Sequence, residues 1–141
     1  MINDGLKLKG KLAIALNGKI IQEVDNLVVT AGKGYVASRM KDTTATAMSH
    51  MAIGSGSTAA AAGDTALGNQ LGRVALTSTT VSGAVVTYVA SFPAGTATGA
   101  VTEAAILNAS SGGTMLCRTV FSVVNKGAQD SMTVTWTVTV S

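Results

Sequence analysis

The chain has 141 residues, of which 47% are apolar, 12% are charged and only 4% are aromatic, and its net charge is +3. This length suits one domain with its own core, and the core must be largely aliphatic because aromatic side chains are scarce. The weak positive charge comes without a dense Lys/Arg cluster, which argues against a nucleic-acid partner. A single cysteine excludes an intrachain disulfide. We therefore expect one domain over residues 1–141.

Charged residues are about half as frequent as in an average soluble domain. A surface with so few charges tends to associate unless it is covered, so the composition favours a protein that works inside an assembly. The alternative is a monomer coated with Ser and Thr hydroxyls. Lysines interrupt the N-terminal apolar positions, and no apolar run is long enough to span a bilayer. We expect no signal peptide, no membrane partner and synthesis in the cytoplasm.

A β-hairpin is predicted at the start of the chain. Apolar residues fall on alternate positions from Leu6 to Leu16, apart from a break at Gly10, and Asn17-Gly18 separates them from a second run, Lys19 to Val24. Asn-Gly between two such runs is the strongest short hairpin signal, because both residues tolerate positive φ. This hairpin, within residues 1–24, is a candidate arm that contacts a partner.

Three lysines, Lys7, Lys9 and Lys11, share one face of the first predicted strand. They are candidate contacts for an acidic partner. The alternative interpretation is a solvated face whose lysines prevent edge-to-edge aggregation of the sheet. The sequence alone leaves both interpretations open.

One helix and a series of strands are predicted after this hairpin. Thr30 can cap a helix from Ala31 to Lys41, with Tyr35 and Met40 in its apolar stripe. Asp64 is expected to cap a single helical turn. Strands are expected at 48–53, 73–81, 84–92, 101–107, 114–124 and 132–140.

The last predicted strand, 132–140, has the plainest pattern. Its apolar side chains, with Trp136 at the centre, alternate strictly with threonines. One face is therefore buried, with Trp136 as a core anchor, and the other is wet or paired with a partner. The candidate partner contacts on that face are Thr133, Thr135 and Thr137. About eight strands with one short helix predict an all-β fold, sandwich-like or jelly-roll-like.

Residues that could carry chemistry are few. His50 is the only histidine and lies in a short apolar strand, and Cys117 lies mid-strand, where cysteine acts as a small apolar residue. The segment Gly54 to Ser57 lacks the lysine of a phosphate-binding loop. We assign no catalytic, cofactor-binding or metal-binding residue and expect no small-molecule substrate. A hydrolase of cell-wall sugar or peptide would need a carboxylate or histidine constellation.

Glu103 is the exception among the acidic residues, because it lies inside a predicted strand beside an apolar run. A charge in that position needs a partner on a neighbouring strand. Arg118 and Arg73 are the two candidates, and we interpret the pair as structural.

Several segments resemble a group of virion proteins of tailed phages. In that group a strand leads into a Gly-x-Gly-Thr/Ser loop, a stretch of small residues and then Asp-Thr-Ala-Leu-Gly-Asn-Glu/Gln. Residues 53–70 of this chain read IGSGSTAAAAGDTALGNQ. Weaker similarities are NLVVTAG at 26–32, EAAILN at 103–108 and LCRTVF at 116–121. The first predicted strands are not part of the resemblance.

The resemblance implies a setting that composition does not. It implies a non-enzymatic phage structural protein, and the lack of a fibre shaft favours a cement or decoration protein on the outer surface of the capsid. Its partners would be the major capsid protein and further copies of itself, as a homodimer or homotrimer. The alternative is a tail-fibre or baseplate component that contacts other tail proteins or the host surface. That alternative predicts exposed aromatic residues in loops.

Overall fold

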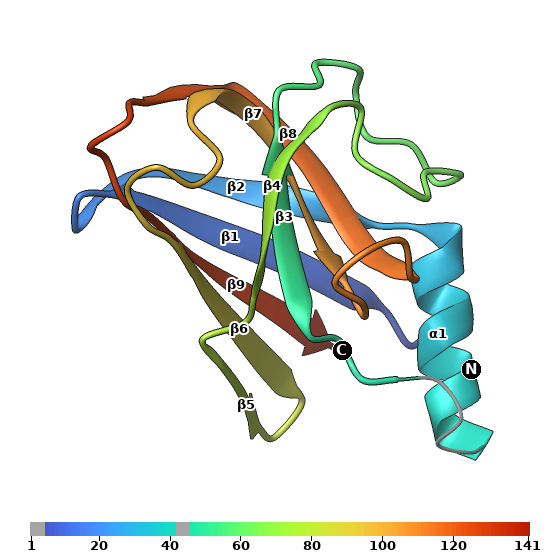
Figure 1. Cartoon of the computed structure of the whole chain (residues 1–141). Helices are drawn as coiled ribbons and strands as arrows, with labels where there is room; N and C mark the ends of the chain where they lie inside the picture. Colours follow the sequence, from blue (N-terminus) through green and yellow to red (C-terminus); the bar gives the residue numbers. More distant parts are fainter. Residues whose placement is uncertain (1–4, 42–45) are drawn as a thin grey trace.

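The computed structural model describes residues 5–41 and 46–141, and residues 1–4 and 42–45 of the expected domain lie outside the described part. The described residues form nine strands and one helix (Figure 1). In chain order the elements are β1 Leu8–Leu16, β2 Lys19–Val28, α1 Thr30–Lys41, β3 His50–Gly54, β4 Gln70–Ala75, β5 Ser78–Ser82, β6 Val85–Phe92, β7 Gly99–Leu107, β8 Met115–Lys126 and β9 Met132–Val140. The prediction of an all-β fold is confirmed.

The strands form a single antiparallel sheet in the order β4-β3-β7-β8-β2-β1-β9-β6-β5. The sheet is strongly curled, so that β3 and β4 cross in front of the β1–β2 region in Figure 1. Its two halves are joined by a short contact, because β2 pairs with β8 only at Leu27↔Arg118 and Val28↔Cys117. One apolar cluster contains residues from both halves and fills the concave side. The two separate sheets of a sandwich or jelly roll are not confirmed.

The N-terminal hairpin forms as predicted, with positive φ at Asn17 and Gly18. It is not an arm, however, because β1 lies inside the sheet between β2 and β9. The break in alternation at Gly10 is no register shift either, since Gly10 pairs in sequence with Val138 on β9. A side chain at Gly10 would collide with the side chain of Asn26, so glycine takes a core-facing position here.

The predicted strand 73–81 is wrong, because two strands replace it. β4 pairs with β3 at one end of the sheet, and β5 pairs with β6 at the other. The chain changes partner at two adjacent residues: the Leu76 amide donates to the Ser49 carbonyl, and the Thr77 amide donates to the Val89 carbonyl. The strand pattern continues across this switch, so residue alternation alone does not reveal it.

The predicted helix is confirmed as α1, but its apolar stripe is shorter than expected. Tyr35 packs against the core, whereas Met40 is 80% exposed. Gly32 is buried, and a Cβ there would collide with the Leu116 backbone of β8. Glycine therefore lets the helix approach the sheet closely. The helical turn expected after Asp64 does not form; its carboxylate instead accepts the amide of Ala61, which precedes it.

Trp136 is fully buried in the concave core. Its indole Nε1 donates to Asn26 Oδ1 at 2.7 Å, which satisfies the one polar atom of the side chain. The threonines that alternate with it lie on the opposite, convex face of the sheet, and Thr135 is exposed. All five aromatic side chains of the protein lie in or against this core: Tyr35, Tyr88, Phe92, Phe121 and Trp136.

Replacing Trp136 by Ala should lower the free energy of unfolding by about 3–5 kcal/mol, because it empties a large site in the concave core. Thr135→Ala, on the exposed face of the same strand, should change it by less than about 0.5 kcal/mol. Urea unfolding followed by circular dichroism measures both. Equal losses in the two variants would contradict the assignment of faces.

Candidate partner-docking site

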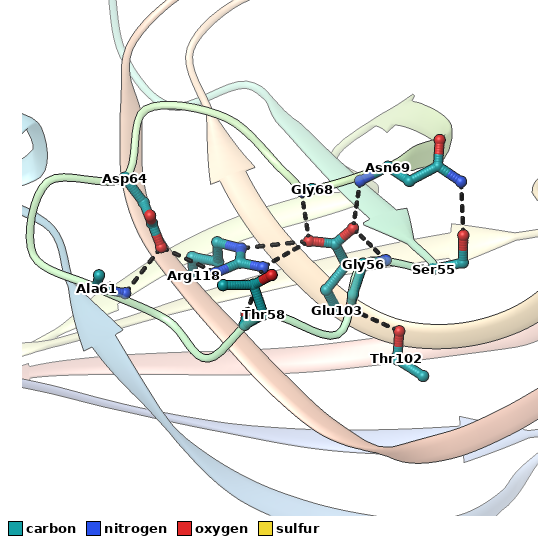
Figure 2. A network of polar contacts seen from close by, with 10 residues as sticks. All are labelled: Ser55, Gly56, Thr58, Ala61, Asp64, Gly68, Asn69, Thr102, Glu103 and Arg118. Carbon is teal, nitrogen blue, oxygen red and sulfur yellow. Dashed lines mark hydrogen bonds and ion pairs between the residues drawn. The ribbon is translucent and has the colours of Figure 1, made fainter.

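A buried ion pair lies at the centre of a network of polar contacts (Figure 2). Glu103 on β7 is 0% exposed, and its carboxylate accepts both Nε and Nη2 of Arg118 on β8, at 3.2 and 2.9 Å. The two residues share the convex face because the strands are neighbours and Arg118 pairs with Ala105. The prediction of an Arg118 partner is confirmed. Arg73 instead contacts Gln70 and two loop carbonyls.

The same carboxylate also binds the long loop between β3 and β4. The backbone amides of Gly56, Gly68 and Asn69 donate to it at 2.6–2.8 Å. This is the Gly-x-Gly segment that superficially resembles a phosphate loop, and the anion that its amides bind is the protein's own Glu103. A Cβ at Gly56 would collide with the Glu103 carboxylate, which explains the glycine at this position.

Arg118 holds the other part of the loop. Its Nη1 donates to Asp64 Oδ2 at 2.9 Å and its Nη2 to the Thr58 carbonyl at 3.0 Å. Asp64 in turn accepts the amide of Ala61. We call this set, Gly56, Asp64, Gly68, Asn69, Glu103 and Arg118 with their partners, the loop clamp. All these residues come from the segments that carry the resemblance to virion proteins.

The loop held by the clamp also contacts the start of α1. The Thr30 amide at the start of the helix donates to the Ala62 carbonyl of the clamped loop at 2.8 Å. Beneath it, a small apolar cluster fills the space between the convex side of the sheet, the helix start and the loop. The members of that cluster are Val29, Ala52, Ala105, Leu107 and Met115, with Ala31 and Leu67 packed against it. The clamped loop therefore contributes one contact to the position of the helix start.

Ionisation of the clamp carboxyls is favoured overall. Burial opposes ionisation of Glu103, but the amides of Asn69 and Gly68, the Arg118 guanidinium and the Gly56 amide outweigh it and lower its pKa. The pKa of Asp64 is lowered mainly by the Ala61 amide, with Arg118 assisting against desolvation. Because every partner of the Glu103 carboxylate is an internal donor, the cluster is suited to holding a loop, with no lone pair turned toward solvent.

The predicted contact residues from the two ends of the chain lie on one face of the sheet. β1 pairs with β9, so Lys11 lies opposite Thr137, and Lys9 lies opposite Thr139. Thr133 and Thr135 continue this face along β9, and Thr87 and Val89 of β6 extend it sideways. Lys11 forms an exposed ion pair with Glu23 at 3.6 Å. We call this surface the threonine face.

An apolar groove opens beside the threonine face, between α1 and the start of β1. It has a volume of about 510 Å³. Leu6 and Met40 are strongly exposed at its sides. The described residues that line it are Leu6, Lys7, Leu8, Lys9, Lys33, Val36, Ala37, Met40 and Val140. The charged residues among them are all lysines. Lys9 belongs to both, so the groove adjoins the threonine face at the start of β1, while the groove residues Leu8 and Val140 lie on the core-facing side of their strands. We call the groove and the threonine face together the candidate docking surface.

Lys7, Lys9 and Lys11 are exposed, as the solvated-face interpretation expected, but they do not protect a sheet edge, which corrects that part of it. β1 has a paired neighbour on each side, so its lysines project from a face. The interpretation as contacts for an acidic partner remains a proposal.

The remaining residues with reactive side chains, Cys117 and His50, are not part of this surface. Cys117 is completely buried, and burial raises the pKa of its thiol, so the reactive thiolate is disfavoured. His50 lies half-buried with its Nδ1 2.8 Å from the Ser49 hydroxyl. Within residues 5–41 and 46–141, no group of three His, Cys, Asp or Glu side chains is placed to hold a metal ion. No helix in these same segments is long and apolar enough to cross a membrane.

Comparisons with known proteins give no relative: no protein-family model, no curated protein and no solved structure matches the chain.

Neutralising the centre of the clamp by Glu103→Gln should lower the free energy of unfolding by about 3–5 kcal/mol, because it leaves Arg118 buried without its main counter-charge. Glu23→Gln, which makes the same change in the exposed pair with Lys11, should cost less than about 1 kcal/mol. Hydrogen exchange should also become faster at the Gly56, Gly68 and Asn69 amides in the Glu103 variant alone. Unchanged protection of these amides would refute the clamp.

Acidification should weaken the protein through the same carboxyls. Their folded-state pKa values lie below the ordinary 4.5 of Glu103 and 3.8 of Asp64, so the stability they contribute is complete above those values. It is lost as the pH falls through the lower folded-state values. Thermal unfolding should thus be nearly constant from about pH 7 to 5 and fall below about pH 4.5. The fall should be shallower in Glu103→Gln; an equally steep fall would place the acid sensitivity elsewhere.

Proposed function

We propose that this chain is a non-enzymatic structural protein of a tailed-phage particle that cements or decorates the capsid. It binds across junctions between major capsid proteins on the outer surface of the shell. Such a protein works through added contact area alone. An interface of roughly 1,600 Å² is enough for stable binding, and repetition around a shell adds avidity.

The observation that carries the proposal is the candidate docking surface. It combines a broad face of hydroxyl and small apolar side chains with an apolar groove in which the charged residues of the described lining are Lys7, Lys9 and Lys33. A protein segment with apolar side chains and flanking carboxylates complements both properties. The groove would take the apolar side chains, and the lysines would pair with the carboxylates.

The elements that form this surface are well packed, which supports the same proposal. The threonine face lies directly over the core that contains Trp136, and one wall of the groove is α1, which the clamped loop and Leu116 hold in place. Because its shape is set before binding, little conformational entropy is lost on docking. The resemblance of the clamp segments to virion proteins supplies the setting, a phage particle.

The location is tested by electron microscopy of particles from the phage or prophage that encodes the chain, labelled with an antibody against it. Label distributed over the head supports the proposal. Label on the tail or baseplate overturns the capsid assignment in favour of the tail alternative. Particles without label overturn both.

The docking surface is tested by binding the purified protein to heads that lack it. Charge reversal at the three groove lysines (Lys7→Glu, Lys9→Glu and Lys33→Glu together) should abolish binding, because each lysine then repels an acidic partner. Lys19→Glu, an exposed lysine of β2 outside the groove lining, is the matched control and should bind. Equal binding by both variants would remove the groove from the proposal.

A further inference from the structure

Strand β5 forms one end of the sheet, and all five of its residues, Ser78 to Ser82, are exposed. It pairs with β6 on one side. No backbone hydrogen bond among the described residues reaches its other side. A strand edge of this kind is a template for pairing with another strand, because its unpaired amides and carbonyls alternate at the spacing that a second strand requires.

This edge lacks the devices that keep edge strands apart. No charged residue occurs between Arg73 and Glu103, a stretch that contains all of β5 and β6. β5 contains no proline, and its register with β6 is regular throughout. Val81 on β5 is 71% exposed. The lysines of the sheet are on β1, β2 and β8, all in its interior, where they give this edge no protection.

The opposite end of the sheet differs. β4 carries Arg73 and has a register irregularity against β3 at Ile53/Gly54. The Arg73 guanidinium is engaged by Gln70 and the carbonyls of Ala109 and Gly112, which brings the loop before β8 against that strand. Of the two end strands in the described sheet, β5 alone is regular and uncharged.

We propose that β5 pairs antiparallel with β5 of a second copy, about a two-fold axis at Thr80. The sequence of the strand fits itself in this register: Ser78 lies opposite Ser82, Thr79 lies opposite Val81, and Thr80 lies opposite its own copy. Threonine pairs and β-branched pairs are favourable across antiparallel strands, and no like charges meet. The exposed Val81 side chain then packs beside Thr79 of the second copy.

A second copy is favoured over an unrelated partner for two reasons. An uncharged edge carries no electrostatic feature that would select a charged partner. Every copy also presents the same unprotected edge, and pairing two identical edges closes the interface and leaves neither strand open. Because a single five-residue strand offers less area than a standard interface, the dimer is expected to be reversible in solution.

The pairing deepens the proposed function, and its use in cementing rests on that function. A dimer joined at β5 would carry two docking surfaces in one continuous sheet, so each copy would gain avidity on a shell. The pairing itself is tested with the purified full chain and without shells, so the two proposals can fail separately. A monomer that still binds heads would overturn the pairing alone, and a β5 dimer that ignores heads would overturn the proposed function alone.

Sedimentation velocity over a range of protein concentrations is the first experiment. The wild type should shift from monomer to dimer with concentration. Val81→Lys places a charge on the edge in both copies and should weaken the dimer by about tenfold or more. Val123→Lys, the same change at an exposed valine of β8, should leave it unchanged. A wild type that stays monomeric, or a dimer that Val123→Lys weakens and Val81→Lys does not, would overturn the inference.

A cysteine at the predicted two-fold axis provides the second experiment. Thr80→Cys should form a disulfide-linked dimer under mild oxidation, because the two side chains lie opposite each other across the paired strands. The native Cys117 is completely buried and cannot react in the folded protein. Thr135→Cys, on the exposed threonine face, should remain monomeric on a non-reducing gel. Crosslinking of Thr135→Cys without Thr80→Cys would locate the contact on that face and exclude β5.

Discussion

The buried carboxylate of Glu103 is the constraint on which the convex side of this protein depends. It binds Arg118 and three backbone amides of the β3–β4 loop, and through that loop it connects to the start of α1. An uncompensated charge in this position would be costly, because a buried carboxylate loses its hydration. Here internal donors replace the water. One side chain thus binds loop amides that lie 34 to 47 residues before it in sequence.

Such a cluster defines the path of the loop that it binds. A well-packed apolar substitute is often as stable as a buried ion pair, but apolar contacts do not define where a glycine-rich loop must lie. The loop from Ser55 to Asn69 has few large apolar side chains, so hydrogen bonds have to determine its path. In this light the Gly-x-Gly and Asp-to-Asn segments are structural in this protein.

The surface divides into regions with different properties. The threonine face and the groove combine lysines, hydroxyls and apolar side chains, whereas the β5–β6 end is free of charge. Charged surfaces select partners through complementarity, and uncharged strand edges pair through the backbone. The two proposed contacts, one with a different protein and one with a second copy, use two separate parts of the same domain.

Local patterns in the sequence determined much of this protein. Alternation placed Trp136 and the threonines on opposite sides of β9, Asn17-Gly18 marked the first turn, and an acid inside an apolar strand required a partner such as Arg118. These features follow from the period of a strand and from the cost of a buried charge, which neighbouring residues reveal.

Only the tertiary structure decided which strands are neighbours. It placed β1 inside the sheet, assigned the single run 73–81 to two opposite ends, and brought the lysines beside the threonines. Residue alternation specifies the two faces of a strand but does not indicate which strands pair with it. Pairing depends on long-range contacts across the whole curled sheet. The sequence pattern assigned β5 to a longer strand. Its exposed edge could therefore be recognised only in the folded structure.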